Sequence, residues 1–314
     1  MGPRGALEAV RDGFVRLGRG EAVLPGVINL DIPQNEVEVH VKGAHLLGTP
    51  TFAIKVAGGS WKNPARGLPV GHGLVLVFDA STSFLRAVLF DNGYLTDLRT
   101  GAAGGLSGDL LARPEVDRVG IIGVGVQGRY QLESLLQVRR PEEVVAYGRS
   151  ADRVAAYAKE MEGRLGIRVT PAKSVEEAVR GSDVVITATP ARSPLVRADW
   201  VGPGTHITAV GSDGPDKQEL DVAVLAKADK VVADRLDQCL HLGEIHHAVE
   251  AGAMRPEDVY AELGEIAAGL KPGRTSGDEI TIADLTGVGV QDAGVAEVVV
   301  SEALRRNLGK ILEV

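Results

Sequence analysis

A glycine-rich turn constrains the fold of this chain more than any other feature. The turn, GVGVQG, follows the apolar run RVGII and precedes a helical pattern. In such a strand–turn–helix unit the first glycine permits a tight turn, the second lets the backbone approach a pyrophosphate, and the third allows close helix packing. The helix N-terminus also favours an anion. The sequence therefore predicts a dinucleotide-binding turn, rather than a purely structural one, at Gly123, Gly125, Val126, Gln127 and Gly128.

The alternation of strand, turn and helix recurs after Pro114. It is typical of an α/β fold in which a doubly wound parallel sheet carries helices on both faces. We therefore expect a Rossmann domain over residues 115–292. Its candidate strands are RVGII, EVVAY, IRVT, DVVITAT, THITAV and DKVVAD.

The first 114 residues follow a different pattern. Residues 5–17 have the apolar spacing of an amphipathic helix, and residues 37–91 alternate like antiparallel strands. Residues 94–111 predict a helix crowded with glycine and alanine, whose small size would serve close packing. We expect an α+β domain over residues 1–114, to which a C-terminal helix over 293–314 returns.

Composition narrows the classes of partner. The formal net charge is −8, without a block of like charges, which argues against nucleic-acid or anionic-membrane binding and favours a small molecule. No stretch has the ~20 apolar residues of a membrane span, and residues 1–16 lack the apolar block of a signal peptide. These features predict a cytoplasmic protein. The single cysteine, Cys239, excludes an internal disulfide.

The end of the second predicted strand bears on cofactor choice. NAD-selective enzymes usually place an acidic residue there for the ribose hydroxyls. This chain has Gly148, Arg149 and Ser150 instead. The Arg149 guanidinium could hold a 2′-phosphate, which favours NADP(H) with NAD(H) also usable; the alternative is a solvated arginine.

Four phrases resemble the ornithine cyclodeaminase and μ-crystallin family: LTDLRTGAAG, GVGVQ, HITAVGSDGPDKQEL and ITIADLTGVGVQD. VHVKGAHLLG, FAIKVAGG, DNGYLTDLRT and LGEIHHA resemble most closely the ectoine-utilisation cyclodeaminase-like proteins and the iminosuccinate reductases. The resemblance implies a homodimer and hydride transfer at a carbon that bears nitrogen.

The resemblance also implies roles for individual residues. Lys55 in FAIK matches an active-site lysine, and Arg99 in LRTG matches an arginine that binds the substrate carboxylate. A guanidinium suits that task because it can bind a carboxylate bidentately. Asp213 in GSDGPDK matches the catalytic aspartate, which would transfer a proton and which Lys217 would orient. The alternative for Asp213 is a helix cap.

Two further segments are expected beside the cofactor. Thr189 follows the fourth predicted strand, while Thr286 and Gly287 match a family loop near the nicotinamide. The latter two could equally form a plain turn.

A basic strand separates this chain from the ornithine-cyclising enzymes. The resemblance implies that the ornithine-cyclising enzymes carry a carboxylate at a position similar to that of Lys42, which would receive the distal amino group of ornithine. This chain has Lys42 there, with His40 and His45 close in sequence. A cationic Lys42 should repel a δ-ammonium and attract a second carboxylate. The alternative is that alternate residues of this strand face solvent.

We expect no metal site at His241, His246 and His247. Adjacent histidines diverge on a helix, and the segment has no standard zinc spacing.

These features together predict an NAD(P)H-dependent imine reductase that forms an L-amino acid, with iminosuccinate to aspartate as the favoured reaction. The alternatives are an ornithine cyclodeaminase, an alanine dehydrogenase and a crystallin-like nucleotide-binding protein without catalysis.

Overall fold

The computed structural model describes residues 1–312, which form two compact units. One comprises, of the described residues, 1–99 with 288–312, and the other comprises Thr100–Gly287. The boundary falls inside helix α2 (Tyr94–Leu111) instead of at residue 114, because the glycines of this helix pack on α3 (Val126–Leu135). A Cβ on Gly101 would lie 2.6 Å from the Tyr130 carbonyl oxygen, so only glycine fits there.

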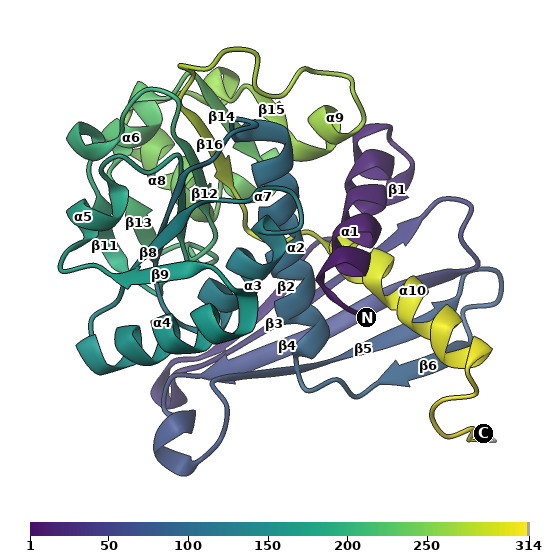
Figure 1. The fold of residues 1–314 in the computed structure, drawn as a ribbon. Helices are drawn as coiled ribbons and strands as arrows, with labels where there is room; N and C mark the ends of the chain where they lie inside the picture. Colours follow the sequence, from purple (N-terminus) through teal and green to yellow (C-terminus); the bar gives the residue numbers. More distant parts are fainter. Residues whose placement is uncertain (313–314) are drawn as a thin grey trace. The chain divides into compact units, whose positions relative to one another are not determined.

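The larger unit contains an eight-stranded parallel sheet (Figure 1). The order is β15-β14-β16-β12-β10-β7-β8-β9. From β7 the chain adds β8 and β9 on one side and then crosses to add β10 on the other side, so the switch point lies between β7 and β10. The six predicted strands are all present, and the apolar run near residue 280 adds β16 between β14 and β12. The strands are β7 (Arg118–Ile122), β8 (Glu143–Tyr147), β9 (Arg168–Pro171), β10 (Val184–Thr187), β12 (His206–Ala209), β14 (Lys230–Ala233), β15 (Ala261–Glu262) and β16 (Thr281–Asp284).

Helices cover both faces of this sheet, as the doubly wound pattern predicts. Along β10, Val184 and Ile186 join one apolar cluster, whereas Val185 joins the other. The remaining helices are α4 (Ala151–Leu165), α5 (Val175–Val179), α6 (Val222–Lys227), α7 (Leu236–Cys239), α8 (Gly243–Glu250) and α9 (Leu263–Ala267). A parallel pair, β11 (Arg192–Val196) and β13 (Gln218–Leu220), lies outside the main sheet.

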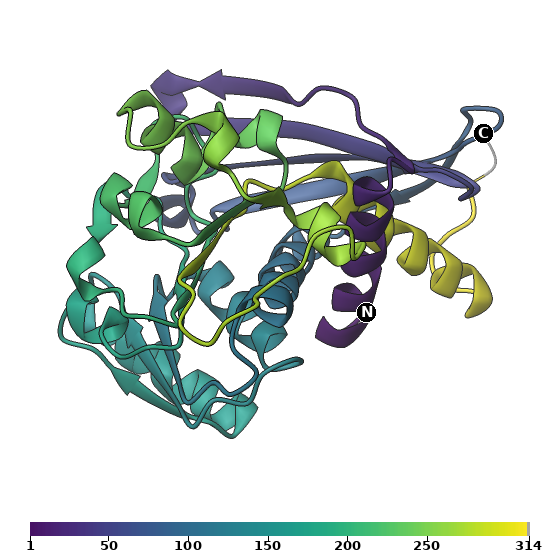
Figure 2. The same cartoon turned by 90° about the horizontal axis from the view of Figure 1, so that it is seen from above.

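The smaller unit contains an antiparallel sheet with the order β1-β3-β4-β5-β6, and β2 also pairs with β3. Helices α1 (Pro3–Gly18) and α10 (Gly289–Arg305) lie side by side in Figures 1 and 2, and α10 contacts β3 and β4. The C-terminal helix thus returns to the N-terminal segment, although it begins at Gly289 and ends at Arg305; residues 313 and 314 lie outside the described part. The strands are β1 (Ala22–Val23), β2 (Ile28–Ile32), β3 (Val37–Leu46), β4 (Thr51–Ser60), β5 (Gly71–Asp79) and β6 (Leu85–Leu89).

The two faces of this antiparallel sheet differ in burial. Directly opposed residues of an antiparallel ladder share a face. One face carries buried residues such as Ala53 and Val77. The opposite face, which we call the open face, carries large apolar side chains that are only half-buried: Val39, Val41, Ile54, Val56, Leu74 and Leu76.

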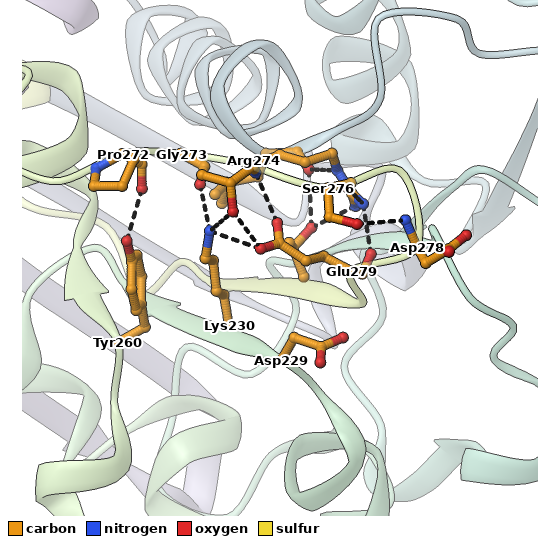
Figure 3. A network of polar contacts seen from close by, with 12 residues as sticks. Asp229, Lys230, Tyr260, Pro272, Gly273, Arg274, Ser276, Asp278 and Glu279 are labelled. Atoms are coloured by element: carbon orange, nitrogen blue, oxygen red, sulfur yellow. Dashed lines mark hydrogen bonds and ion pairs between the residues drawn. The ribbon is translucent and has the colours of Figure 1, made fainter.

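A network of hydrogen bonds and ion pairs connects the first residues of β14 and β16 to the loop that precedes β16 (Figure 3). Lys230 lies between Tyr260 and Glu279, and its Nζ donates to the Gly273 carbonyl oxygen (2.7 Å) and pairs with Glu279 (3.0 Å). Arg274 donates to the Thr281 hydroxyl oxygen (3.0 Å). Because doubly wound sheets bind ligands at the opposite, carboxyl edge, this network is structural.

No described helix is both long and apolar enough to cross a membrane.

Candidate active site

The predicted dinucleotide turn joins β7 to α3. Gly123 has a φ of +111°, which an L side chain rarely adopts, and a Cβ on Gly128 would lie 2.2 Å from the Gly123 carbonyl oxygen. Gly125, directly before α3, would meet nothing within 4 Å. The outer two glycines therefore serve the turn and its packing, while the middle one leaves space beside a helix N-terminus. That space fits a pyrophosphate.

Arg129 holds this turn in place, which sequence reasoning missed. Its Nη1 donates to the carbonyl oxygens of Val124 and Gly125, both at 2.9 Å, and its Nη2 pairs with Glu160 at 2.7 Å. Of the other predicted members of the turn, Val126 is exposed and Gln127 is half-buried.

The end of β8 has no carboxylate. Arg149 is exposed, and the Ser150 hydroxyl caps α4 by accepting the Arg153 N–H (3.4 Å). Ser150 thus has a structural task, whereas Arg149 presents a guanidinium to solvent.

Glu219 fixes the carboxyl ends of β10 and β12. Its carboxylate accepts the backbone N–H groups of Thr189 (2.6 Å) and Gly211 (2.8 Å). Burial raises the pKa of Glu219 to about 7. The structure thereby places the predicted Thr189 beside the glycine turn, since a Cβ on Gly123 would lie 3.0 Å from its Cγ2.

Asp213 lies in the segment that follows β12. Its Oδ1 accepts a hydrogen bond from Lys217 Nζ at 2.8 Å, and the Lys217 side chain is buried while that of Asp213 is 49% exposed. The expected pairing with Lys217 is therefore present. The half-exposed Asp213 carboxylate thus follows the carboxyl end of β12, the edge at which doubly wound sheets bind ligands.

Thr286 and Gly287 form a buried turn anchored by Asp234. Asp234 accepts the Thr286 hydroxyl (2.9 Å) and the Gly287 N–H (2.6 Å), and Gly287 has a φ of +85°. These contacts favour the plain-turn alternative for both residues. Asp234 carried no sequence signal, because its partners lie about fifty positions later.

The smaller unit gathers buried charge around Asp292. Lys42 and Lys55 lie directly opposite each other on β3 and β4, and both are buried. Lys55 Nζ lies 3.7 Å from Asp292 Oδ2, and Arg99 Nε donates to Asp292 Oδ1 at 3.0 Å. Three cationic side chains from three elements thus share one region.

Gln291 completes this cluster. Arg99 Nη1 donates to Gln291 Oε1 at 2.6 Å. Gln291 Nε2 and Asp292 Oδ2 are buried, and neither makes a hydrogen bond among the described residues. Asp292 Oδ2 has the nearby Lys55 ammonium as its ion-pair partner, whereas Gln291 Nε2 is a buried donor that a polar ligand could satisfy. Sequence reasoning quoted the VQD motif but gave neither residue a role.

The two histidines predicted to lie near Lys42, His40 and His45, lie on opposite faces of β3. His40 shares the face of Lys42, and its Nδ1 lies 2.7 Å from Asn29 Oδ1. His45 lies on the opposite face, and its Nδ1 donates to the Thr51 carbonyl oxygen at 3.1 Å. The structure therefore brings Lys42 to Lys55 but does not bring His45 to either, because side chains alternate along a strand.

Comparison with known proteins identifies the family. An alanine dehydrogenase of Archaeoglobus fulgidus is 43% identical over 97% of this chain and 92% of its own length. An iminosuccinate reductase of Paracoccus denitrificans is 35% identical over 100% and 96%.

Solved structures of a reductase and a dehydrogenase are also similar to this chain over nearly its whole length. Thermococcus litoralis Δ1-pyrroline-2-carboxylate reductase, in complex with NADH and L-proline, superposes with a TM-score of 0.95 at 32% identity and covers 99% of this chain and 96% of its own. An archaeal alanine dehydrogenase dimer with bound NAD has a TM-score of 0.93 at 41% identity, covering 100% of this chain and 95% of its own. The model of the ornithine cyclodeaminase/mu-crystallin family matches residues 4–307, and the chain belongs to this family.

Proposed function

We propose that this chain is an NAD(P)H-dependent oxidoreductase that reduces an imino acid to an L-amino acid, with iminosuccinate to aspartate as the favoured reaction. The observation that carries the proposal is the buried cluster of Lys42, Lys55 and Arg99. With the single carboxylate of Asp292 beside them, these three cations make a mainly basic site. A basic site favours an anionic substrate, and a substrate with two carboxylates complements it best.

Arg99 would bind the α-carboxylate. Its Nε and Nη1 are held by Asp292 and Gln291, so the guanidinium is oriented before substrate arrives. Gln291 Nε2, a buried donor, would add a hydrogen bond to the same carboxylate. Lys55 would supply further positive charge beside the imine, and Lys42 would bind the distal carboxylate.

Asp213 would transfer the proton in both directions of the reaction. Its carboxyl group would donate a proton to the imine nitrogen during reduction and accept one from the amine during oxidation. Lys217 holds that carboxyl group in place. Bound NAD(P)H would supply the hydride.

The open position at Gly125 and the exposed Arg149 support either nicotinamide cofactor. The pyrroline-2-carboxylate reductase and the alanine dehydrogenase were solved with NADH and NAD. Arg149 would let this chain accept the 2′-phosphate of NADP(H) as well.

Replacing Gly125 with alanine should weaken NADH and NADPH binding at least about tenfold without destabilising the fold, because the added methyl group occupies only the space meant for the pyrophosphate. Fluorescence titration of both cofactors and thermal unfolding would measure the two effects. Gly202→Ala is the matched control, since its Cβ would also meet nothing within 4 Å. Equal cofactor affinity in wild type and Gly125→Ala would contradict the assignment of this turn.

The test of the function compares initial rates of NADH and NADPH oxidation with iminosuccinate, made from oxaloacetate and ammonia, and with the imine of pyruvate. A higher rate on the dicarboxylic imine supports the proposal. Lys42→Met should remove this preference while retaining activity on the pyruvate imine, because only the larger substrate has a distal carboxylate. A preference for the pyruvate imine in the wild type would assign the chain as an alanine dehydrogenase, which the 43% identity makes the second candidate.

Two other activities are separable in the same assay. An ornithine cyclodeaminase would convert ornithine to proline and ammonia without net cofactor consumption. A nucleotide-binding protein without catalysis would bind NADH yet turn over no imine. The buried Lys42 disfavours the first, because it would repel the δ-ammonium of ornithine.

We further propose that the chain forms a homodimer through the open face. A contiguous patch of large, incompletely buried apolar side chains, such as the one on the open face of the antiparallel sheet, is typical of a protein–protein interface. The related archaeal alanine dehydrogenase was solved as a dimer.

Ile54→Glu should convert the dimer to a monomer, because Ile54 lies on β4 in the middle of the open face and its replacement would bury a charge in the interface. Size-exclusion chromatography with light scattering would measure the mass. Leu270→Glu, at an exposed apolar residue of the other unit, is the control and should leave the mass unchanged. A monomeric wild type would refute the proposed dimer.

A further inference from the structure

Helix α8 brings three ligand-type side chains together on its surface. One ligand atom from each of His246, His247 and Glu250 lies within 4.8 Å of the other two. The imidazole rings are 5.0 Å apart and tilted by 55°. The expectation that adjacent histidines diverge on a helix is therefore wrong here, because side-chain rotation brings the two rings back together.

Backbone contacts determine which ring nitrogens carry protons. His246 Nδ1 donates to the Leu240 carbonyl oxygen (3.2 Å), and His247 Nε2 donates to the Lys217 carbonyl oxygen (2.8 Å). A carbonyl oxygen only accepts, so in each neutral ring the other nitrogen, Nε2 of His246 and Nδ1 of His247, keeps its lone pair. Metal-binding histidines show this same arrangement, with the second ring nitrogen donating to a carbonyl group.

The third ligand stands one helical turn away. Glu250 Oε2 lies 3.5 Å from His246 Nε2, so the two groups pair when the ring is protonated and could share a metal ion when that nitrogen has lost its proton. The i, i+4 spacing places both groups over the same strip of the helix. Glu250 is exposed and the histidines are half-buried, so ions from solvent can reach the three groups.

We propose that His246, His247 and Glu250 bind a divalent transition-metal ion, with water completing the coordination. Two imidazole nitrogens and one carboxylate suit Zn²⁺, Co²⁺ or Ni²⁺ better than Mg²⁺ or Ca²⁺, which prefer oxygen ligands alone. The proposed ion has no part in the proposed reaction. It would instead fix α8 to the segment of Lys217, whose carbonyl oxygen accepts from His247 and whose Nζ holds Asp213.

Isothermal titration of the untagged full-length chain with Zn²⁺ tests this site, and titration with Co²⁺ adds a visible absorption band as an independent readout. We expect one saturable equivalent of either ion. His247→Ala and Glu250→Gln should each weaken Zn²⁺ binding at least about tenfold. Circular dichroism confirms that each variant is folded, and the exposed position of Glu250 makes its replacement the safer of the two.

The exposed His241 provides the matched control, because it lies outside the cluster. His241→Ala should bind Zn²⁺ as the wild type does. The proposal is overturned if the wild type shows no saturable binding, or if both cluster variants bind as tightly as the wild type. Neither result bears on imine reduction, so the two proposals fail separately.

Discussion

The Asp292→Asn variant should lose about 3 kcal/mol of unfolding free energy, because removal of one partner from a buried ion pair leaves an uncompensated charge. Asp292 is 1% exposed and contacts both Lys55 and Arg99. Asparagine keeps the shape of the side chain but removes its charge, so two cations lose their common counter-ion. Urea unfolding at neutral pH would measure the loss.

The same variant should lower kcat/KM for the imine on the order of 100-fold, which corresponds to about 2.7 kcal/mol of transition-state stabilisation. Arg99 would lose the carboxylate that orients it, so substrate binding weakens and KM rises. Affinity for NADH should not change, because the glycine turn belongs to the other unit. A loss of stability with unchanged KM would restrict Asp292 to a structural role.

Glu8→Gln is the control for the charge change. Glu8 pairs with Arg4 at 3.3 Å on an exposed surface of the same unit. Exposed ion pairs contribute about 0–1 kcal/mol, so this variant should unfold and turn over nearly as the wild type does.

Local pattern explains how much of the larger unit could be predicted from sequence. Each of the six predicted strands is an apolar run bounded by turn residues, and both faces of the sheet are covered, so burial itself is visible in the sequence. The positive φ of Gly123 and the close packing of Gly128 follow from the same local motif. The opening at Gly125 also agrees with the motif, which predicts that the second glycine lets the backbone approach a pyrophosphate.

The acidic partners of the candidate site could not be predicted in this way. Asp292 meets Arg99 across 193 positions, and Glu219 meets Thr189 across thirty. Neither carboxylate stands in a motif whose spacing reveals its partner. Such contacts depend on how elements pack, which the periodicity of one element does not contain.

The position of His45, in contrast, could have been predicted from the alternation of side chains along a strand. The positions of Lys42 and His45 differ by three, an odd number, and side chains alternate along a strand. They therefore had to lie on opposite faces once residues 37–46 formed one unbroken strand. Grouping them by proximity in sequence overlooked this rule.

The expected domain boundary at residue 114 also neglected packing. Helix α2 carries five small residues in succession, Gly101 to Gly105, which sequence reasoning assigned to close contact but without naming the partner. The partner is α3 of the larger unit, so most of α2 belongs there.

Acidification should destabilise this protein through His206. The side chain is fully buried, and its ring nitrogens lie 3.0 Å from the hydroxyl oxygens of Thr281 and Thr208. Burial, with a further contribution from the charge of Arg274, lowers the pKa of His206 to about 3. In the unfolded chain a histidine has a pKa of about 6.5. Between these values only the unfolded state takes up the proton, so stability is lost as pH falls below 6.5.

The expected loss is about 3 kcal/mol between pH 7 and pH 4.5. Two buried carboxyl groups act in the opposite direction: burial raises the pKa of Asp284 and of Glu219 to about 7, so their contribution to stability falls as pH rises from about 4 to 7. The test is therefore the difference between variants. Urea unfolding across this range should show that His206→Gln removes the acid-dependent loss assigned to His206, whereas the exposed His241→Gln retains it. If the His206→Gln profile runs parallel to that of the wild type, the histidine is not the group whose protonation unfolds the chain.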